Sequence, residues 1–154
     1  MSRIHVQAER VVDVRPEEVY AFLANYREDR QRILPPNYLD YWIEQGGYGA
    51  GTVVSYRLQA GGRERPYRIQ VEEPGQGRLL MERDTNSSLI NTWTVSPLSG
   101  GQTLVTLTTE WDGQGAGMGG FFERTFAPLG LKKIYADMLH RLADALGTSA
   151  AASR

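Results

Sequence analysis

The sequence predicts an α+β fold in which about seven antiparallel strands form a curved sheet around one long C-terminal helix, with two short helices after the first strand. Three observations support this fold. Apolar residues alternate with a period of two through most of residues 38–111, glycine or proline separates the alternating segments, and apolar residues recur at helical spacing between Phe122 and Leu146. Strands and helices do not alternate along the chain, which argues against a parallel sheet.

The first strand is expected within residues 3–14, where alternate residues are apolar. An amphipathic helix follows from Pro16, because proline suits the first helical turn and Glu17 and Glu18 stabilise the positive end of the helix dipole. Residues 27–36 add a second short helical segment, which a proline pair ends. The mixed charges of this second segment indicate a solvated face.

The middle of the chain predicts an antiparallel meander. Six further strands are expected at residues 38–45, 52–59, 67–73, 78–85, 88–97 and 102–111. Each boundary between them carries glycine or proline at short spacing, which is typical of hairpin connections.

The last helix contains an interruption, because Pro128 and Gly130 fall between two apolar stretches at helical spacing. Inside a helix, proline costs roughly 3 kcal/mol and glycine about 1 kcal/mol more than alanine. We expect a kinked or two-part helix whose halves follow the twisted sheet, with two helices joined by a turn as the alternative. Residues 1–147 are expected to form a single domain and residues 148–154 a disordered tail.

Composition excludes several classes of function. The 154 residues include 17 basic and 18 acidic side chains that are well mixed, so no cationic surface is expected to gather nucleic acid. No apolar run approaches the ~20 residues of a membrane span. There is no cysteine and only two histidines, so we expect no metal site, and we expect no cofactor. The expected protein is cytoplasmic and either a monomer or a homodimer.

Four local segments and the order of the elements resemble one known superfamily. The segments are VVDVRPEEVYAFL, GAGTVVSY, VEEPGQGRLLME and NTWTVSPLSGGQTLVTLTTEW, and ERTFAPLGLKKIYADMLHRLADAL is similar to that superfamily's long terminal helix. The chain from Ile4 to Leu146 thus resembles the START-like helix-grip superfamily (SRPBCC), which includes pollen-allergen-like proteins and the polyketide cyclase/dehydrase branch. The resemblance implies a helix-grip fold with a ligand cavity between sheet and helix.

The inward faces of the strands combine large apolar residues with a few neutral polar groups. Alternation alone favours an ordinary core in which such groups pair internally, whereas the resemblance favours a small-molecule pocket, typically of roughly 300–1,000 Å³. The expected ligand is hydrophobic or aromatic, lipid-like or polyketide-like. The expected ligand-binding residues are Tyr56, Tyr67, Ile69, Asn91, Trp93, Val95, Leu107, Thr109, Trp111, Phe122, Phe126, Tyr135 and Met138.

An aromatic cluster in NYLDYWIEQGGYG has two interpretations. Tyr38, Tyr41, Trp42 and Tyr48 either frame the mouth of a pocket or pack at the sheet edge. Alternation places Tyr41 and Trp42 on opposite faces, so both cannot point inward.

The alternative function is an enzyme of the polyketide cyclase/dehydrase type, although no catalytic motif is present. Glu82 and Asp84 lie two residues apart on one strand face, and such a pair can supply an acid and a base if one carboxyl group is desolvated. Carboxylates at a strand end are more often solvated charges. Tyr67 and Asn91 are the other candidates for assisting proton transfer.

The segment GAGMGG matches G-x-G-x-x-G at residues 115–120, between a strand and a helix. A dinucleotide site also needs a returning parallel strand with an acidic residue, and neither follows. We therefore expect residues 112–120 to form a mobile connection, and we hypothesise that it gates the pocket.

Overall fold

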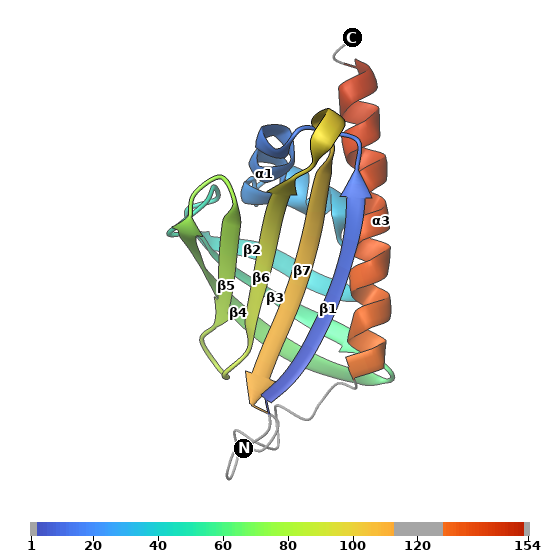
Figure 1. The fold of residues 1–154 in the computed structure, drawn as a ribbon. Helices are drawn as coiled ribbons and strands as arrows, with labels where there is room; N and C mark the ends of the chain where they lie inside the picture. The colour runs from blue at the N-terminus through green and yellow to red at the C-terminus, as the bar shows by residue number, and fades with distance from the viewer. Residues whose placement is uncertain (1–2, 113–127, 153–154) are drawn as a thin grey trace.

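The computed structural model describes residues 3–112 and 128–152, and it confirms the predicted class of fold (Figure 1). Seven strands and a long C-terminal helix are present, with short helices after the first strand. The elements are β1 (Arg3–Val12), α1 (Pro16–Ala24), the 3₁₀ helix η1 (Asp29–Ile33), β2 (Tyr38–Gln45), β3 (Val53–Ala60), β4 (Arg63–Gly75), β5 (Leu79–Asp84), β6 (Ile90–Pro97), the 3₁₀ turn η2 (Ser99–Gly101), β7 (Thr103–Asp112) and α3 (Pro128–Ala152).

The strands form one antiparallel sheet in the order β1-β7-β6-β5-β4-β3-β2. Figure 1 shows that the sheet curves, that α3 runs along its length beside β1, and that α1 lies at one end. The two edge strands are therefore β1, which pairs with β7, and β2, which pairs only with β3. The β2–β3 register is interrupted twice, and Asp40 has a positive φ of 53°. Such irregularities are typical of edge strands.

The alternation of the sequence determines which side chains face the core. In β6 and β7 every second residue is buried, so Asn91, Trp93 and Val95 share the inner face with Val105 and Leu107. Since successive side chains of a strand point to opposite faces, the residues between these are partly exposed on the convex side. The predicted facing of β6 and β7 is confirmed.

A glycine-rich connection between β2 and β3 fixes the C-terminal end of α1. The amide of Gly49 donates to the carbonyl of Ala24 at 3.0 Å, and the amide of Tyr26 donates to the carbonyl of Gly47 at 2.9 Å. Gly49 has a φ of +61°, and a Cβ there would lie 2.3 Å from Glu73 Oε1. The positive φ favours glycine, and a Cβ here would also displace the Glu73 carboxylate, which accepts hydrogen bonds from the Ala50 amide and the Tyr20 hydroxyl. This connection holds Tyr26 at the end of α1.

Helix α3 (Pro128–Ala152) includes both Pro128 and Gly130. The predicted kinked or two-part helix depends on the residues before Pro128, which lie outside the described residues, so it stays a prediction. The helix continues to Ala152, past the expected boundary at Gly147, because the alanines that follow favour helix. The predicted disordered tail is thus corrected for residues 148–152. The apolar stretch before Pro128, the glycine motif at residues 115–120 and the proposed gate lie outside the described residues.

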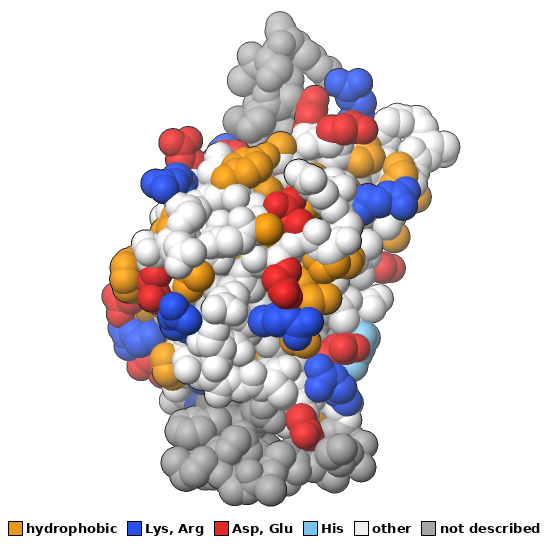
Figure 2. Space-filling view, turned by 90° about the vertical axis from the view of Figure 1, so that its left-hand side faces the viewer, with side chains coloured by type: hydrophobic (Ala, Val, Ile, Leu, Met, Phe, Trp, Pro, Cys, Tyr) orange, Lys and Arg blue, Asp and Glu red, His pale blue; other side chains and the backbone are white. Residues whose placement is uncertain are grey.

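Among the described residues, no helix is long and apolar enough to cross a bilayer. On the face shown in Figure 2, acidic and basic side chains are interspersed rather than gathered into a field of one sign. Within the same residues, no group of three or more His, Cys, Asp or Glu side chains could hold a metal ion.

Candidate functional site

A cavity lies between the inner face of the sheet, η1 and α3. Its walls combine tyrosine and tryptophan rings with aliphatic side chains, one ion pair and one amide. The lining residues are Tyr26, Arg30, Leu34, Tyr38, Tyr41, Val54, Tyr56, Ile69, Glu82, Asn91, Trp93, Leu107, Tyr135 and Met138.

The part of the cavity that the described residues enclose is small. Its volume is about 30 Å³, against the roughly 300–1,000 Å³ typical of preformed small-molecule sites. A void of about 10–15 Å³ on this measure holds one water molecule, so the space admits only a few water molecules at most. Tyrosine rings make up much of the lining, and the space that the described residues leave here is too small for an organic ligand. A preformed pocket between sheet and helix therefore stays a prediction.

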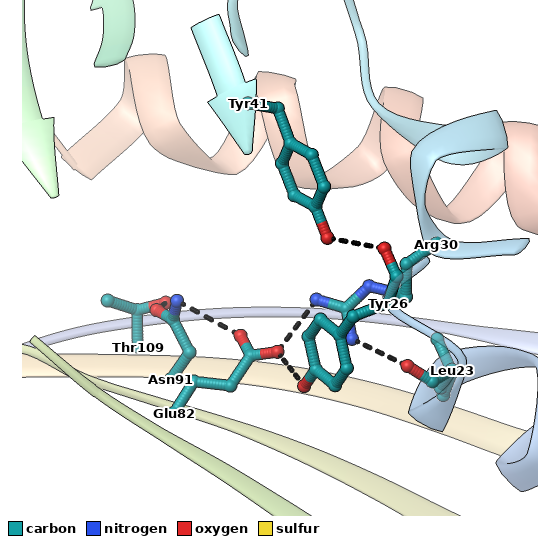
Figure 3. Close-up of polar contacts among 7 residues, drawn as sticks. All are labelled: Leu23, Tyr26, Arg30, Tyr41, Glu82, Asn91 and Thr109. Atoms are coloured by element: carbon teal, nitrogen blue, oxygen red, sulfur yellow. Dashed lines mark hydrogen bonds and ion pairs between the residues drawn. The ribbon is translucent and has the colours of Figure 1, made fainter. Parts of the chain in front are cut away.

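An ion pair between Arg30 and Glu82 is buried in the cavity wall (Figure 3). Arg30 comes from η1 and Glu82 from β5, and Arg30 Nη2 lies 2.7 Å from Glu82 Oε2. The same carboxylate oxygen accepts a 2.5 Å hydrogen bond from the Tyr26 hydroxyl. Arg30 Nη1 donates to the Leu23 carbonyl at 3.1 Å. The two charged side chains are only 8% and 5% exposed. Each therefore provides the opposite charge that offsets the cost of taking the other out of water.

The guanidinium group of Arg30 is also enclosed by aromatic rings. Its Cζ lies 4.7 Å from the ring centroid of Tyr26 and 4.8 Å from that of Trp93. Both distances are within the range of cation–π attraction. Two buried donors of this group remain without an acceptor among the described residues, namely Arg30 Nε and Trp93 Nε1. Buried N–H groups of this kind are rare in proteins and indicate a position where a water or ligand oxygen fits.

A chain of hydrogen bonds continues from Glu82 across the sheet to α3. Asn91 Nδ2 donates to Glu82 Oε1 at 3.4 Å, and Thr109 Oγ1 donates to Asn91 Oδ1 at 2.7 Å. The hydroxyl groups of Thr109 and Tyr135 lie 2.8 Å apart. Figure 3 shows Thr109, Asn91 and Glu82 side by side over the sheet, with Glu82 reaching Arg30 and Tyr26. Polar groups from α1, η1, three strands and α3 are therefore connected through the cavity wall.

Burial shifts the ionisation of the cavity's polar groups. Burial by itself lowers the pKa of Arg30, but Glu82 and nearby tyrosines raise this pKa by more than burial lowers it. The pKa of Arg30 therefore lies above its ordinary value. Burial, reinforced by the charge of Glu82, raises the pKa of Tyr26 well above its usual range. Burial also raises the pKa of Tyr41 to about 12, against the effect of Arg30. These tyrosines are therefore neutral hydroxyl groups at physiological pH.

Rings from β2, β3 and β4 stack on one side of the cavity. Tyr56 lies at the centre, with ring-centroid distances of 5.1 Å to Tyr38, 6.5 Å to Tyr41 and 5.5 Å to Tyr67. Tyr38, Tyr41 and Tyr56 line the cavity, and they are only partly buried. This wall belongs in part to the edge strand β2, which has one neighbour.

The structure separates the residues predicted to bind ligand into three groups. Those that line the cavity are Tyr56, Ile69, Asn91, Trp93, Leu107, Tyr135 and Met138. Those that are buried but do not line it are Tyr67, Val95, Thr109 and Trp111, and Val95 instead lines a separate outer groove. Phe122 and Phe126 lie outside the described residues. A role in ligand binding remains a prediction for all of them.

The two candidate carboxylates have different environments. Both are buried, at 4% exposure for Glu82 and 5% for Asp84, so the expectation of solvated charges is wrong. Only Glu82 lines the cavity. Asp84 Oδ2 lies 3.6 Å from Arg65 Nη2. The Asp84 carboxylate also accepts hydrogen bonds from the Ser87 hydroxyl at 2.7 Å and from the amide of Arg68 at 3.1 Å. These contacts fix the β5–β6 turn, which is a structural role.

Arg30 is the main residue that sequence reasoning missed, because the mixed charges of residues 26–32 suggested a solvated helical face. Arg30 is instead buried at 7% exposure. A signal was present, since Tyr26, Arg30 and Ile33 follow the i, i+4, i+7 spacing of one helical face and the other two residues are buried.

The aromatic cluster of the β2 region is divided between three places. Tyr38 and Tyr41 line the interior cavity, whereas Trp42 is 57% exposed on the opposite face, as the alternation predicted. Tyr48 is 61% exposed and lines a separate outer groove of about 460 Å³ between α1 and the β4–β5 turn. Tyr48 therefore does not frame the mouth of the interior cavity.

The curved sheet, the long helix and the aromatic cavity between them define a START-like helix-grip protein. More specifically, the chain belongs to the family described as polyketide cyclase/dehydrase and lipid transport, whose model matches residues 3–147. Comparison with curated proteins gave no match.

Solved structures with the same fold include three that illustrate its range. KanY protein (ms6282) is 37% identical with a TM-score of 0.82, over 96% of this chain and 99% of that one. The Zhui aromatase/cyclase from Streptomyces sp. R1128 is 18% identical with a TM-score of 0.65, over 99% and 97%. A point mutant of norcoclaurine synthase from Thalictrum flavum, in complex with a transition-state analogue, is 14% identical with a TM-score of 0.73, over 96% of each chain.

Proposed function

We propose that this protein binds a hydrophobic or aromatic small molecule, lipid-like or polyketide-like, in the interior cavity between the sheet and α3. The observation that carries this proposal is the pair of unsatisfied donors, Arg30 Nε and Trp93 Nε1, on residues that line an aromatic cavity. Leaving a buried donor unpaired costs about 1–3 kcal/mol. A ligand oxygen that accepts from either group recovers this cost while the ligand's apolar part contacts the rings.

Binding requires the cavity to enlarge, and the tyrosine wall on β2 and β3 is the part best suited to move. Tyr38, Tyr41 and Tyr56 are only partly buried, and β2 has a single neighbour with an irregular register. Rotating these rings outward disturbs fewer contacts than moving the buried residues of the central strands. Burial of apolar ligand surface, at about 25 cal/mol per Å², supplies the driving force.

The family and its structural neighbours support this class of function. The family description includes lipid transport, and the similar structures include proteins named as an aromatase/cyclase and as norcoclaurine synthase. These descriptions support an organic small molecule as the class of ligand for this chain.

The test begins with the purified protein. Its organic extract is analysed by mass spectrometry for a retained apolar compound, and 2-naphthol is titrated by calorimetry. We expect saturable binding whose dissociation constant changes by about 10-fold or more in Trp93→Ala, because this substitution replaces a large part of the cavity wall by empty space. Trp42→Ala is the matched control, since Trp42 is exposed on the outer face. Equal binding by both variants would exclude the interior cavity as the site.

A second candidate function is a cyclase- or dehydrase-type reaction in the same cavity, with Glu82 as the acid/base residue. The observation that favours it is that Glu82 alone of the two predicted carboxylates lines the cavity. Glu82→Gln should lower turnover of a polyketide-like substrate by roughly 10²-fold or more while the substrate still binds. Unchanged turnover would remove Glu82 from the reaction.

A further inference from the structure

The interior cavity contains two charged side chains of opposite sign, which directly contact one another. Among the described residues that line it, Arg30 and Glu82 are the only ionic groups. Their closest atoms are 2.7 Å apart, and both side chains are nearly inaccessible to solvent. The sum of the charges presented to a ligand is therefore zero.

We propose that this cavity selects uncharged ligands, and that Glu82 is the specificity-determining residue that rejects anions by compensating the charge of Arg30. This inference rests on the proposed ligand-binding function of the cavity and adds the charge class of the ligand. Without Glu82, a buried guanidinium group with an unpaired Nε would attract an anion strongly.

The compensation is geometrically secure, because several groups orient the carboxylate. Glu82 Oε2 accepts hydrogen bonds from both Arg30 and Tyr26, and Oε1 accepts from Asn91. Asn91 is held in turn by Thr109 at 2.7 Å. The carboxylate therefore remains beside the guanidinium group when a ligand occupies the remaining space.

The other polar groups around the cavity add no charge. They are tyrosine hydroxyl groups, the Trp93 indole N–H and one amide, and burial raises the pKa of the phenols, so they stay in their neutral form. An anion entering this space loses its hydration, and the attraction of Arg30 is largely cancelled by the repulsion of Glu82 at a similar distance. An uncharged molecule loses far less hydration, and it still finds the unpaired donor of Arg30 and the rings of the tyrosine wall.

The proposal is tested with two probes that share one ring system. At pH 7, 2-naphthol is uncharged and 2-naphthoate is an anion. Their dissociation constants are measured by calorimetry on the full chain, and the ratio between them reports charge selectivity. In the native protein we expect 2-naphthol to bind at least about 10-fold more tightly, and equal affinities would overturn the proposal.

The decisive variant is Glu82→Gln, which keeps the shape of the side chain and removes its charge. We expect the affinity for 2-naphthoate, relative to that for 2-naphthol, to rise by about 10-fold or more, because the charge of Arg30 is then uncompensated. Glu72→Gln is the matched control: it also removes one negative charge, but Glu72 pairs with Arg83 in a half-exposed contact away from the cavity. The ratio in this control should equal that of the native protein.

A second variant keeps the test decisive if Glu82→Gln does not fold. Arg30→Gln removes the positive charge, so the affinity for 2-naphthoate relative to that for 2-naphthol should not rise. A rise would contradict the proposal. If 2-naphthol binds but Glu82→Gln leaves the ratio of the two dissociation constants unchanged, the role of Glu82 is refuted while the proposed ligand-binding function stands. Failure of every folded variant and of the native protein to bind either probe would refute the proposed function and, with it, this inference.

Discussion

The ion pair between Arg30 and Glu82 makes a strong prediction for stability, because it connects η1 to β5 in the interior. Arg30→Met retains an apolar side chain of similar length but leaves the carboxylate without its cation. Breaking a buried ion pair by removing one partner costs about 3–5 kcal/mol. In this chain the substitution also removes the bond to the Leu23 carbonyl and the contacts with the Tyr26 and Trp93 rings. We therefore expect a loss of at least about 3 kcal/mol.

For a domain of this length, each kcal/mol lowers the melting temperature by about 2–4 °C, so Arg30→Met should melt about 6–20 °C lower. Urea denaturation followed by tryptophan fluorescence gives the free energy of unfolding directly. The double variant Arg30→Met/Glu82→Leu removes both charges, and we expect it to recover at least about 1–2 kcal/mol of the loss.

An outer ion pair provides the control for this measurement. Arg83 and Glu72 are 2.6 Å apart, but both side chains are about half exposed. Arg83→Met should therefore cost less than about 1 kcal/mol. The reasoning is refuted if Arg30→Met costs as little as this control, or if the double variant is no more stable than the single one.

The remaining predictions concern the supports of the site and its response to pH. Gly49→Ala should destabilise the protein by at least about 1 kcal/mol more than Gly51→Ala in urea titrations. Both glycines have positive φ, but only a Cβ at Gly49 would displace the Glu73 carboxylate from its hydrogen bonds with the Ala50 amide and the Tyr20 hydroxyl. Equal losses would contradict this close approach. Tyr20→Phe removes the 2.5 Å hydrogen bond to Glu73 and should cost about 1–2 kcal/mol, and a melting temperature equal to that of the native protein would count against it. Burial raises the pKa of Tyr41 to about 12 against about 10 in the unfolded chain, so its contribution to stability is complete below pH 10 and is lost as the pH rises toward 12. Near pH 11 an unshifted phenol is about 90% ionised, so phenolate absorbance there, measured with circular dichroism, should show a tyrosine fraction that is still protonated; full ionisation of all tyrosines in a folded protein would contradict this.

The face of the sheet on which each side chain lies was predictable, because it depends only on neighbouring residues of the same strand. Side chains of a strand alternate between two faces, so the alternation of residues 89–111 was sufficient to place Asn91 and Trp93 on the inner face beside Leu107. The same rule separated Tyr41 from Trp42. Glu82 and Asp84 were also correctly placed on one face, but their burial was not, because burial depends on what covers that face.

The pairing of Arg30 with Glu82 was not predictable in the same way. These residues are separated by 52 positions, and they meet only because the sheet curves and η1 is held across its end. The local pattern of charges around Arg30 indicated solvent, since a charged side chain is normally stable only there. The partner that makes its burial possible comes from a distant strand.

By itself, the sequence determined the class of fold, the order of the elements and the inward residues of the central strands, because periodicity and turn residues act over a few positions. Only the tertiary structure decided that Arg30 is buried against Glu82, that Asp84 supports a turn, and that tyrosine rings line a cavity of about 30 Å³ among the described residues. These properties depend on how the curved sheet and the helices approach one another, and they therefore result from contacts between residues far apart in the chain.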